Sequence, residues 1–378
     1  MPFNIGIFLY IVAYCLTEGM IFAAAGKAGK KTSRVLFVRS IIFVALAGLI
    51  YFHTECTRYV DYDRMSTEMS LSLSKGASYL FDLYSLNPLS AVPLALIAKT
   101  GVFPLLKSLS ACVYYGVLLY IAGKLRQTYG AFSATITTVF FLCTVDLSYP
   151  ADTIRFPIAS AIFALGYVGY SYFSFSPIKA LSLMLFGCFF HASMWPFLII
   201  FLSTRIFKKN IFIIILTFFL IFYFQIVNLV SSLISSISPA LGWKIQLYFE
   251  TDGQYYESLI SNEQFIYLLF IYIFICTLFL LKRTFSKQEN SQSDRVFIMY
   301  SCFLLGSIHS NVIFPRYIPF LILISLPFIA DIFSRYTNSG YTGKNSWAMH
   351  FIFVSFILVS IFGLILRFAF SYIPFYLT

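Results

Sequence analysis

The feature that most constrains the fold of this chain is a series of apolar runs, each close to the length that crosses a lipid bilayer. Hydrophobic residues make up 60% of the 378 residues and charged residues only 11%. A soluble domain carries about 45–50% and about 25% of these classes. So few charges could not cover a core that holds 45 Phe and 27 Tyr. These numbers exclude a soluble enzyme, a disulfide-stapled secreted domain and a disordered chain.

A helix needs about 20 apolar residues to cross roughly 30 Å of hydrocarbon. Runs near that length lie at about 5–25, 35–53, 104–122, 131–149, 156–173, 211–230, 265–281, 296–308, 317–333 and 348–368. Another apolar run, between Lys179 and Lys208, is interrupted near Pro196, where we predict a turn between two short spans. The sequence therefore predicts an all-α polytopic integral membrane protein with about 12 transmembrane helices, some short or re-entrant. Residues 1–378 are predicted to form a single transmembrane domain.

The distribution of charge predicts the orientation of the spans. Most of the 26 basic residues lie in connections on one side, at 27–39, 124–126, 179, 205–209, 282–295 and 335–344. The positive-inside rule makes that side cytoplasmic. Most acidic residues, both termini and two long loops at about 54–103 and 231–264 are then outside, with 88–101 at most a re-entrant or interfacial helix. The net charge of +11 is mainly a topology signal, so we predict no nucleic-acid partner.

Polar residues that could carry chemistry lie on the outer side, in the first loop or where loops meet spans. They are Arg58, Asp61, Asp63, Arg64, Asp152, Arg155, His191, His309 and Arg316. Cations at this depth suit a lipid-linked phosphate, whose anionic head lies at the interface while its polyprenyl tail stays in lipid. Arg offers a rigid fork for phosphate oxygens. A His, whose unperturbed pKa lies near neutral pH, can accept or donate a proton.

Each of these residues also has a plainer interpretation. An Arg at the end of a span commonly extends to lipid headgroups. His191 could be a packed, hydrogen-bonded residue at a helix end. The Asp61-x-Asp63 pattern can hold a divalent metal near a sugar diphosphate, but so short a pattern recurs by chance, and no other spacing indicates a ligand set. We therefore predict no metal.

Three stretches, in order along the chain, resemble the Wzy-type polysaccharide polymerases, specifically the EpsG-like branch. The first is Tyr59–Arg64, similar to that branch's Asp- and Tyr-containing loop. The second is Thr153–Ala159, with Arg155, followed after an Ala-rich span by Phe189–Ser193, with His191. The third is Pro315-Arg316-Tyr317, at the start of a late span. Together they cover most of the chain.

The family is also described with paired Arg-x10-Gly and Arg-x9-Gly patterns. Ten residues separate Arg155 from Gly166. That spacing is about three helical turns, so both residues lie on one face of the span. No Gly follows Arg316 at the second distance, so the equivalence of Arg316 with the family's second Arg stays open.

The resemblance implies a GT-C-like membrane glycosyltransferase that joins undecaprenyl-pyrophosphate-linked repeat units into O-antigen, capsule or exopolysaccharide. Arg155 and Arg316, with Arg64, Arg58, His309 and Asp152, would bind the substrate and its pyrophosphate. The base would be His191, or otherwise Asp61 or Asp63. The implied enzyme uses no cofactor. It works at the periplasmic face of the bacterial inner membrane, beside a flippase and a chain-length regulator.

Three alternatives stay open. One is a membrane glycosyltransferase that uses a polyprenyl-phosphate sugar, with Asp61 or Asp63 as its base. Another is a flippase or transporter of lipid-linked oligosaccharides, although such a protein should place ionisable groups near the midplane and show an internal repeat. Here the only mid-span charge of note is Glu18. A membrane acyltransferase would need an acyl donor to reach His191, normally from the cytoplasmic side.

Overall fold

The computed structural model describes residues 10, 12–17, 29–55, 60–76, 78–145, 149–206, 210–237, 262–286, 291–308, 310, 313–338, 346–370 and 376–377. The chain divides into two compact units, and each is treated by itself. The first combines Met1–Trp195 with Leu326–Thr378, and the second is Pro196–Ser325. Whether they form a single transmembrane domain stays a prediction.

The described residues are almost entirely helical. The first unit contains α2 (Gly29–Phe52), α3 (Val60–Lys75), α4 (Ser78–Leu83), α5 (Pro88–Thr100), α6 (Leu105–Tyr129), α7 (Ala131–Thr144), α8 (Tyr149–Asp152), α9 (Arg155–Tyr172), α10 (Pro177–Phe190), η1 (Ala192–Met194) and α17 (Ser346–Phe370). The second contains α12 (Asn210–Ile237), α14 (Asn262–Ser286) and α15 (Gln292–Gly306). α11 (Trp195–Ile206) and α16 (Ile313–Asn338) run across the division.

Four of the described helices are long and apolar enough to cross a membrane: Val35–Phe52, Leu105–Tyr129, Glu263–Arg283 and Ile313–Tyr336. The prediction of an all-α membrane protein is confirmed at this level, and the count of about 12 crossings stays a prediction. Shorter apolar helices, such as Ala131–Thr144 and Pro177–Phe190, also coincide with predicted runs.

Both the exposed and the buried face of α14 are apolar, as expected for a helix that contacts lipid. Its exposed large side chains include Ile266, Phe270, Ile273 and Leu280, which repeat at helical spacing along one face. The opposite face is buried, with Ile271, Ile275 and Leu278. A helix that is apolar on both its buried and its exposed face is suited to hydrocarbon rather than water.

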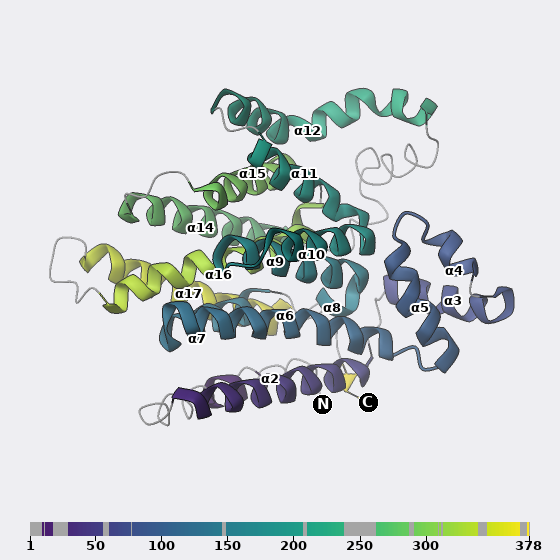
Figure 1. The fold of residues 1–378 in the computed structure, drawn as a ribbon, viewed down its shortest axis with the longest axis horizontal. Coiled ribbons are helices and arrows are strands. Elements are labelled where there is room, and N and C mark those ends of the chain that lie inside the picture. The colour runs from purple at the N-terminus through teal and green to yellow at the C-terminus, as the bar shows by residue number, and fades with distance from the viewer. Residues whose placement is uncertain are drawn as a thin grey trace. The chain divides into compact units, whose positions relative to one another are not determined.

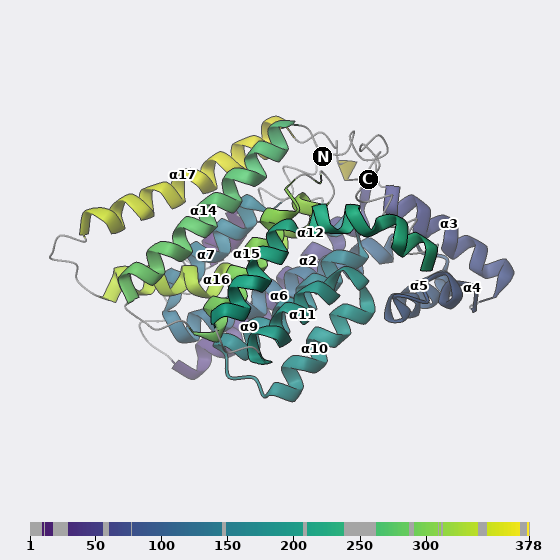
Figure 2. The ribbon, with the colours of Figure 1, turned by 90° about the horizontal axis from the view of Figure 1, so that it is seen from above.

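The core of the first unit is built around α6, which packs against α2, α7 and α9 (Figure 1). The chain then turns from α9 into α10 through residues 173–176 only, and the two helices pack along each other (Figure 2). Because this connection is so short, the beginning of α9 and the end of α10 lie at the same end of a helical hairpin. That end carries Arg155 and His191.

Two glycines allow α9 and α10 to approach closely. A Cβ on Gly166 would lie 2.7 Å from the carbonyl oxygen of Ala180, and a Cβ on Gly187 would lie 2.8 Å from that of Ala159. Small residues at such contacts let helix backbones approach in membranes. The Gly of the Arg-x10-Gly pattern therefore sits in the α9–α10 interface.

The interruption predicted near Pro196 is confirmed and lies just before it. α10 ends at Phe190, and His191 has extended backbone angles of φ −148° and ψ 118°. The 3-10 turn η1 follows, and α11 begins at Trp195 with Pro196 in its first turn. Proline is tolerated there because the first N–H groups of a helix lack intrahelical partners.

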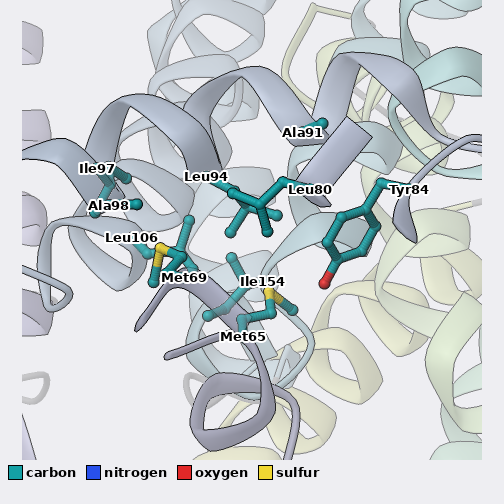
Figure 3. Close-up of a cluster of buried hydrophobic side chains, with 10 residues drawn as sticks. All are labelled: Met65, Met69, Leu80, Tyr84, Ala91, Leu94, Ile97, Ala98, Leu106 and Ile154. Carbon is teal, nitrogen blue, oxygen red and sulfur yellow. The ribbon is translucent and has the colours of Figure 1, made fainter. Parts of the chain in front are cut away.

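The first predicted outer loop contains three helices, α3, α4 and α5. They pack around a cluster of buried side chains that also includes Leu106 of α6 and Ile154 (Figure 3). The cluster comprises Met65, Met69, Leu80, Tyr84, Ala91, Leu94, Ile97, Ala98, Leu106 and Ile154. The segment is thus a small packed layer attached to α6 and to the start of α9.

A two-residue antiparallel ladder joins two parts of the first unit that are distant in sequence. β1 (Thr54–Glu55) pairs with β2 (Tyr376–Leu377), with Glu55 opposite Tyr376. The end of the chain therefore lies beside the point where the first predicted outer loop begins.

Candidate functional site

The backbone before Arg155 is held in an uncommon conformation. α8 ends at Asp152, and Ile154 has φ 20° and ψ −61°, outside the regions that a β-branched residue normally adopts. The Ser110 hydroxyl on α6 donates a 3.1 Å hydrogen bond to the Ile154 carbonyl oxygen. Ile154 itself is fully buried. The surrounding packing therefore fixes the point at which α9 starts and from which the Arg155 side chain leaves.

The Arg155 guanidinium lies over an aromatic ring rather than against a carboxylate. Its Cζ is 4.5 Å from the centroid of the Tyr84 ring. Among the described residues, its buried Nε makes no hydrogen bond and its side chain makes no ion pair. A buried N–H donor without an acceptor costs about 1–3 kcal/mol. Among the described residues, this donor is therefore able to bind an acceptor that a ligand supplies.

Tyr84 is tied to α3 through its hydroxyl. The hydroxyl donates a hydrogen bond to Glu68 Oε2, and Glu68 Oε1 lies 3.8 Å from Arg64 Nε. Arg64 also contacts Asp61, with 2.9 Å between Nη2 and Oδ1. Burial raises the pKa of Tyr84, so its phenol stays protonated and acts as a donor at neutral pH. Figure 3 shows the Tyr84 ring at the edge of the apolar cluster.

His191 is fixed by contacts on two sides. Its Nδ1 accepts a 3.2 Å hydrogen bond from the Ser193 N–H, which caps η1. The N–H of Ala192, the residue directly after His191, donates a 2.6 Å hydrogen bond to Oδ1 of the buried Asn87, between α4 and α5. The His191 ring also meets the Phe156 ring edge to face at 5.4 Å. Because Phe156 follows Arg155 directly, these contacts link His191 to the start of α9.

The structure thus connects four of the predicted residues, Asp61, Arg64, Arg155 and His191, through side chains of the first unit. Asp63 lies exposed in the first turn of α3.

The other predicted residues are not joined to this site. Arg316 lies in the second unit, near the start of α16, so its membership of the site stays a prediction. Arg58 and His309 lie outside the described residues, and so does the side chain of Asp152.

Sequence reasoning missed four residues that build this region. Glu68, Tyr84 and Asn87 connect α3 and the α4–α5 turn to Arg155 and His191. The fourth is Lys107, one turn before Ser110 on α6. Its side chain is only 4% exposed, and its Nζ lies 4.6 Å from the centroid of the Tyr62 ring. The sequence signal for Lys107 was its position near the beginning of an apolar span. A Lys there is informative because fully buried Lys is rare.

Among the described residues, no group of three or more His, Cys, Asp or Glu side chains is arranged to hold a metal ion. The site instead links Arg155 and Arg64 with the acidic stretch of α3 and the His191 ring. Lys107, on α6, lies against Tyr62 of α3. This arrangement can bind an anion and donate hydrogen bonds to it. Comparisons with models of known families, with curated proteins and with solved structures find no match.

Proposed function

We propose that this protein is a repeat-unit polymerase that resembles the Wzy-type enzymes and joins undecaprenyl-pyrophosphate-linked oligosaccharides. The observation that carries the proposal is the α9–α10 hairpin. It brings two parts of the resemblance, the Arg155 stretch and the Phe189–Ser193 stretch, to one end. At that end, Arg155 keeps a buried N–H without an acceptor in the part of the chain that the structure describes.

The reaction requires stabilisation of a departing pyrophosphate. The acceptor's sugar hydroxyl attacks the anomeric carbon of the donor glycan, the new C–O bond forms, and the bond to undecaprenyl pyrophosphate breaks. The pyrophosphate takes the bonding electrons, and the hydroxyl proton passes to a base. Arg155 lies beside Tyr84 with its charge available, and it would hold the growing negative charge on the phosphate oxygens.

The hydrogen bond to Nδ1 bears on the role of His191. A neutral ring that accepts at Nδ1 carries its hydrogen on Nε2. In this tautomer His191 is a donor toward a phosphate oxygen rather than a base. Asp61 and Asp63 then become the first candidates for the base. Asp61 already pairs with Arg64, whereas Asp63 is exposed at the start of α3.

The proposal places the protein in the bacterial inner membrane, with about 12 crossings, a GT-C-like architecture and a periplasmic active face. The pairing of β1 with β2 supports this topology, because it sets the chain's end beside the start of the first outer loop. Lipid-linked donor and acceptor would enter from the bilayer. A flippase and a chain-length regulator are the partners that such an enzyme requires.

A deletion strain tests the function. Strains complemented with Arg155→Ala or His191→Ala should keep the protein in the membrane, yet their surface polysaccharide should stop at a single repeat unit. Lys179→Ala, at the opposite end of the α9–α10 hairpin, is the control and should restore long chains. Long chains in both site mutants would refute the assignment.

The lipid-linked glycans of the same deletion strain separate the alternatives. Single units that accumulate on the outer leaflet fit a polymerase, whereas accumulation on the cytoplasmic leaflet indicates a flippase. Repeat units that lack one sugar indicate a transferase using a polyprenyl-phosphate sugar. Cysteine labelling at positions 191 and 316 tests the topology separately, and labelling from the cytoplasm at either position would contradict the site.

A further inference from the structure

We propose that Tyr84 is a positioning residue for Arg155, held in place by Glu68, so that the α3–α4 layer directs the guanidinium toward a bound anion. The inference rests on the proposed function for the identity of that anion, the pyrophosphate of a lipid-linked substrate. Tyr84 and Glu68 lie in the segment that the sequence presents as a loop, and neither belongs to the stretches that carry the resemblance.

Two contacts define the arrangement. The Arg155 Cζ lies 4.5 Å from the centroid of the Tyr84 ring, and the Tyr84 hydroxyl donates to Glu68. Tyr84 is only 5% exposed, and its ring belongs to the buried cluster formed by α3, α4 and α5. The ring therefore has little room to reorient, and it is fixed both by packing and by its hydroxyl.

An aromatic ring holds a cation differently from a carboxylate. The ring attracts the guanidinium through its face, and the N–H groups in the plane of the guanidinium are not consumed. A carboxylate in the same place would accept those N–H groups and cancel the charge. Holding Arg155 on Tyr84 thus preserves a donor for a phosphate oxygen. The buried Nε, which lacks an acceptor among the residues with a described structure, is the expected consequence.

Glu68, the nearby carboxylate, is kept from pairing with Arg155 by its other partners. Glu68 accepts from the Tyr84 hydroxyl through one oxygen and faces Arg64 at 3.8 Å through the other. Asp61 is in turn bound to Arg64. Asp61 and Glu68 are thus engaged with Arg64 and Tyr84, and Arg155 stays outside their ion pairs.

The test uses the full-length protein in lipid nanodiscs, with farnesyl pyrophosphate as the probe. Tyr84→Phe keeps the ring and should bind the probe within threefold of the wild type. Tyr84→Leu removes the ring and should weaken binding about tenfold. Tyr79→Leu is the matched control. It packs against the same cluster and lies under Lys75 with 4.8 Å between Nζ and the ring centroid, and its binding should not change.

A double-mutant cycle separates positioning from general support of the fold. In an Arg155→Gln background, which carries no cation, Tyr84→Leu should change the remaining probe binding less than twofold, because the charge that the ring positions is gone. A tenfold loss in both backgrounds would show a merely structural role and overturn the inference. Wild-type binding by Tyr84→Leu alone would also overturn it.

The single variant Arg155→Ala distinguishes the inference from the proposed function. If Arg155→Ala loses probe binding while Tyr84→Leu keeps it, the positioning role fails and the anion site stands. If Arg155→Ala binds the probe as well as the wild type, the anion site itself fails, and the positioning role fails with it. Melting temperatures in the nanodiscs check that each variant is folded.

Discussion

Two cations of the predicted cytoplasmic segments, Lys282 and Arg335, are held differently from Arg155 at the candidate site. Lys282 and Asp294 form an ion pair of 3.1 Å, and their side chains are only 10% and 6% exposed. Arg335 pairs with Asp331 at 3.0 Å, one helical turn away. Arg155, by contrast, lies on the Tyr84 ring, and no carboxylate pairs with it in the described ranges.

We interpret Lys282 and Arg335 as charges that support the fold and Arg155 as a charge available to the proposed ligand. Asp294 and Asp331 are among the few acidic residues on the predicted cytoplasmic side, and their pairs explain why they occur there. A paired cation has its charge cancelled, whereas an arginine on an aromatic face keeps both its charge and its donors. The comparison predicts which substitutions reduce activity and which reduce stability.

The largest expected effect is on activity at Arg155. Arg155→Ala should lower the rate of chain extension about 10³-fold, close to 4 kcal/mol of transition-state stabilisation, because it removes a preorganised cation from the leaving group. The melting temperature should hardly change, since the substitution also removes a buried donor without an acceptor. Extension assays in membranes measure the first effect, and nanodisc melting measures the second. A large loss of stability would show that Arg155 supports the fold as Lys282 does, and would contradict the contrast between them.

The next effect is on stability at Lys282. Lys282→Met should destabilise the second unit by about 3 kcal/mol, because it leaves the buried Asp294 carboxylate uncompensated. The double variant Lys282→Met/Asp294→Leu should recover most of that loss, since an apolar pair of similar size avoids the cost of burying charge. Denaturation in detergent measures both. Chain extension per folded molecule should be the same as in the wild type, and a selective loss of extension would contradict a structural role.

Much of the fold follows from apolar patterning. The apolar runs predicted at 104–122, 131–149 and 156–173 became α6, α7 and α9, because a long apolar stretch with little charge has few alternatives to a helix in lipid. The interruption before Pro196 was equally visible. The helices α3 and α4 were not, because their polar and small residues bury only a narrow apolar face against neighbours distant in sequence.

The candidate site was predictable only in part. Arg155 and His191 stand out at the ends of apolar runs, and the structure connects them. Tyr84, Glu68 and Asn87 are ordinary residues in a polar stretch, and their roles depend on contacts with residues up to 105 positions away. Such pairings are set by tertiary packing, which no local pattern encodes.

A smaller effect is expected at Gly166, where close contact between α9 and α10 positions Arg155 and His191. Its Cβ would lie 2.7 Å from the Ala180 carbonyl oxygen, which belongs to the backbone of α10, so Gly166→Ala must separate the two helices. We expect a loss of about 2 kcal/mol of stability. Chain extension should also fall, roughly tenfold, because a small displacement of reacting groups is costly.

The control for Gly166 is Gly123→Ala on α6, where a Cβ would meet nothing within 4 Å. That variant should lose neither stability nor activity. Equal behaviour of the two glycine variants in melting and extension assays would show that close contact between α9 and α10 does not position Arg155 and His191.

The smallest effect is expected at Arg335, and it sharpens the comparison most directly because this residue, like Arg155, is an arginine. Its side chain is 40% exposed, and its pair with Asp331 joins positions one turn apart on α16. Exposed pairs of this kind contribute about 0.3–0.5 kcal/mol, since water screens both charges. Arg335→Ala should therefore shift the melting temperature only slightly and leave chain extension within twofold. If Arg335→Ala instead reduced extension as strongly as Arg155→Ala, the loss of any arginine would impair the protein, and the partner that holds each arginine would not decide its role.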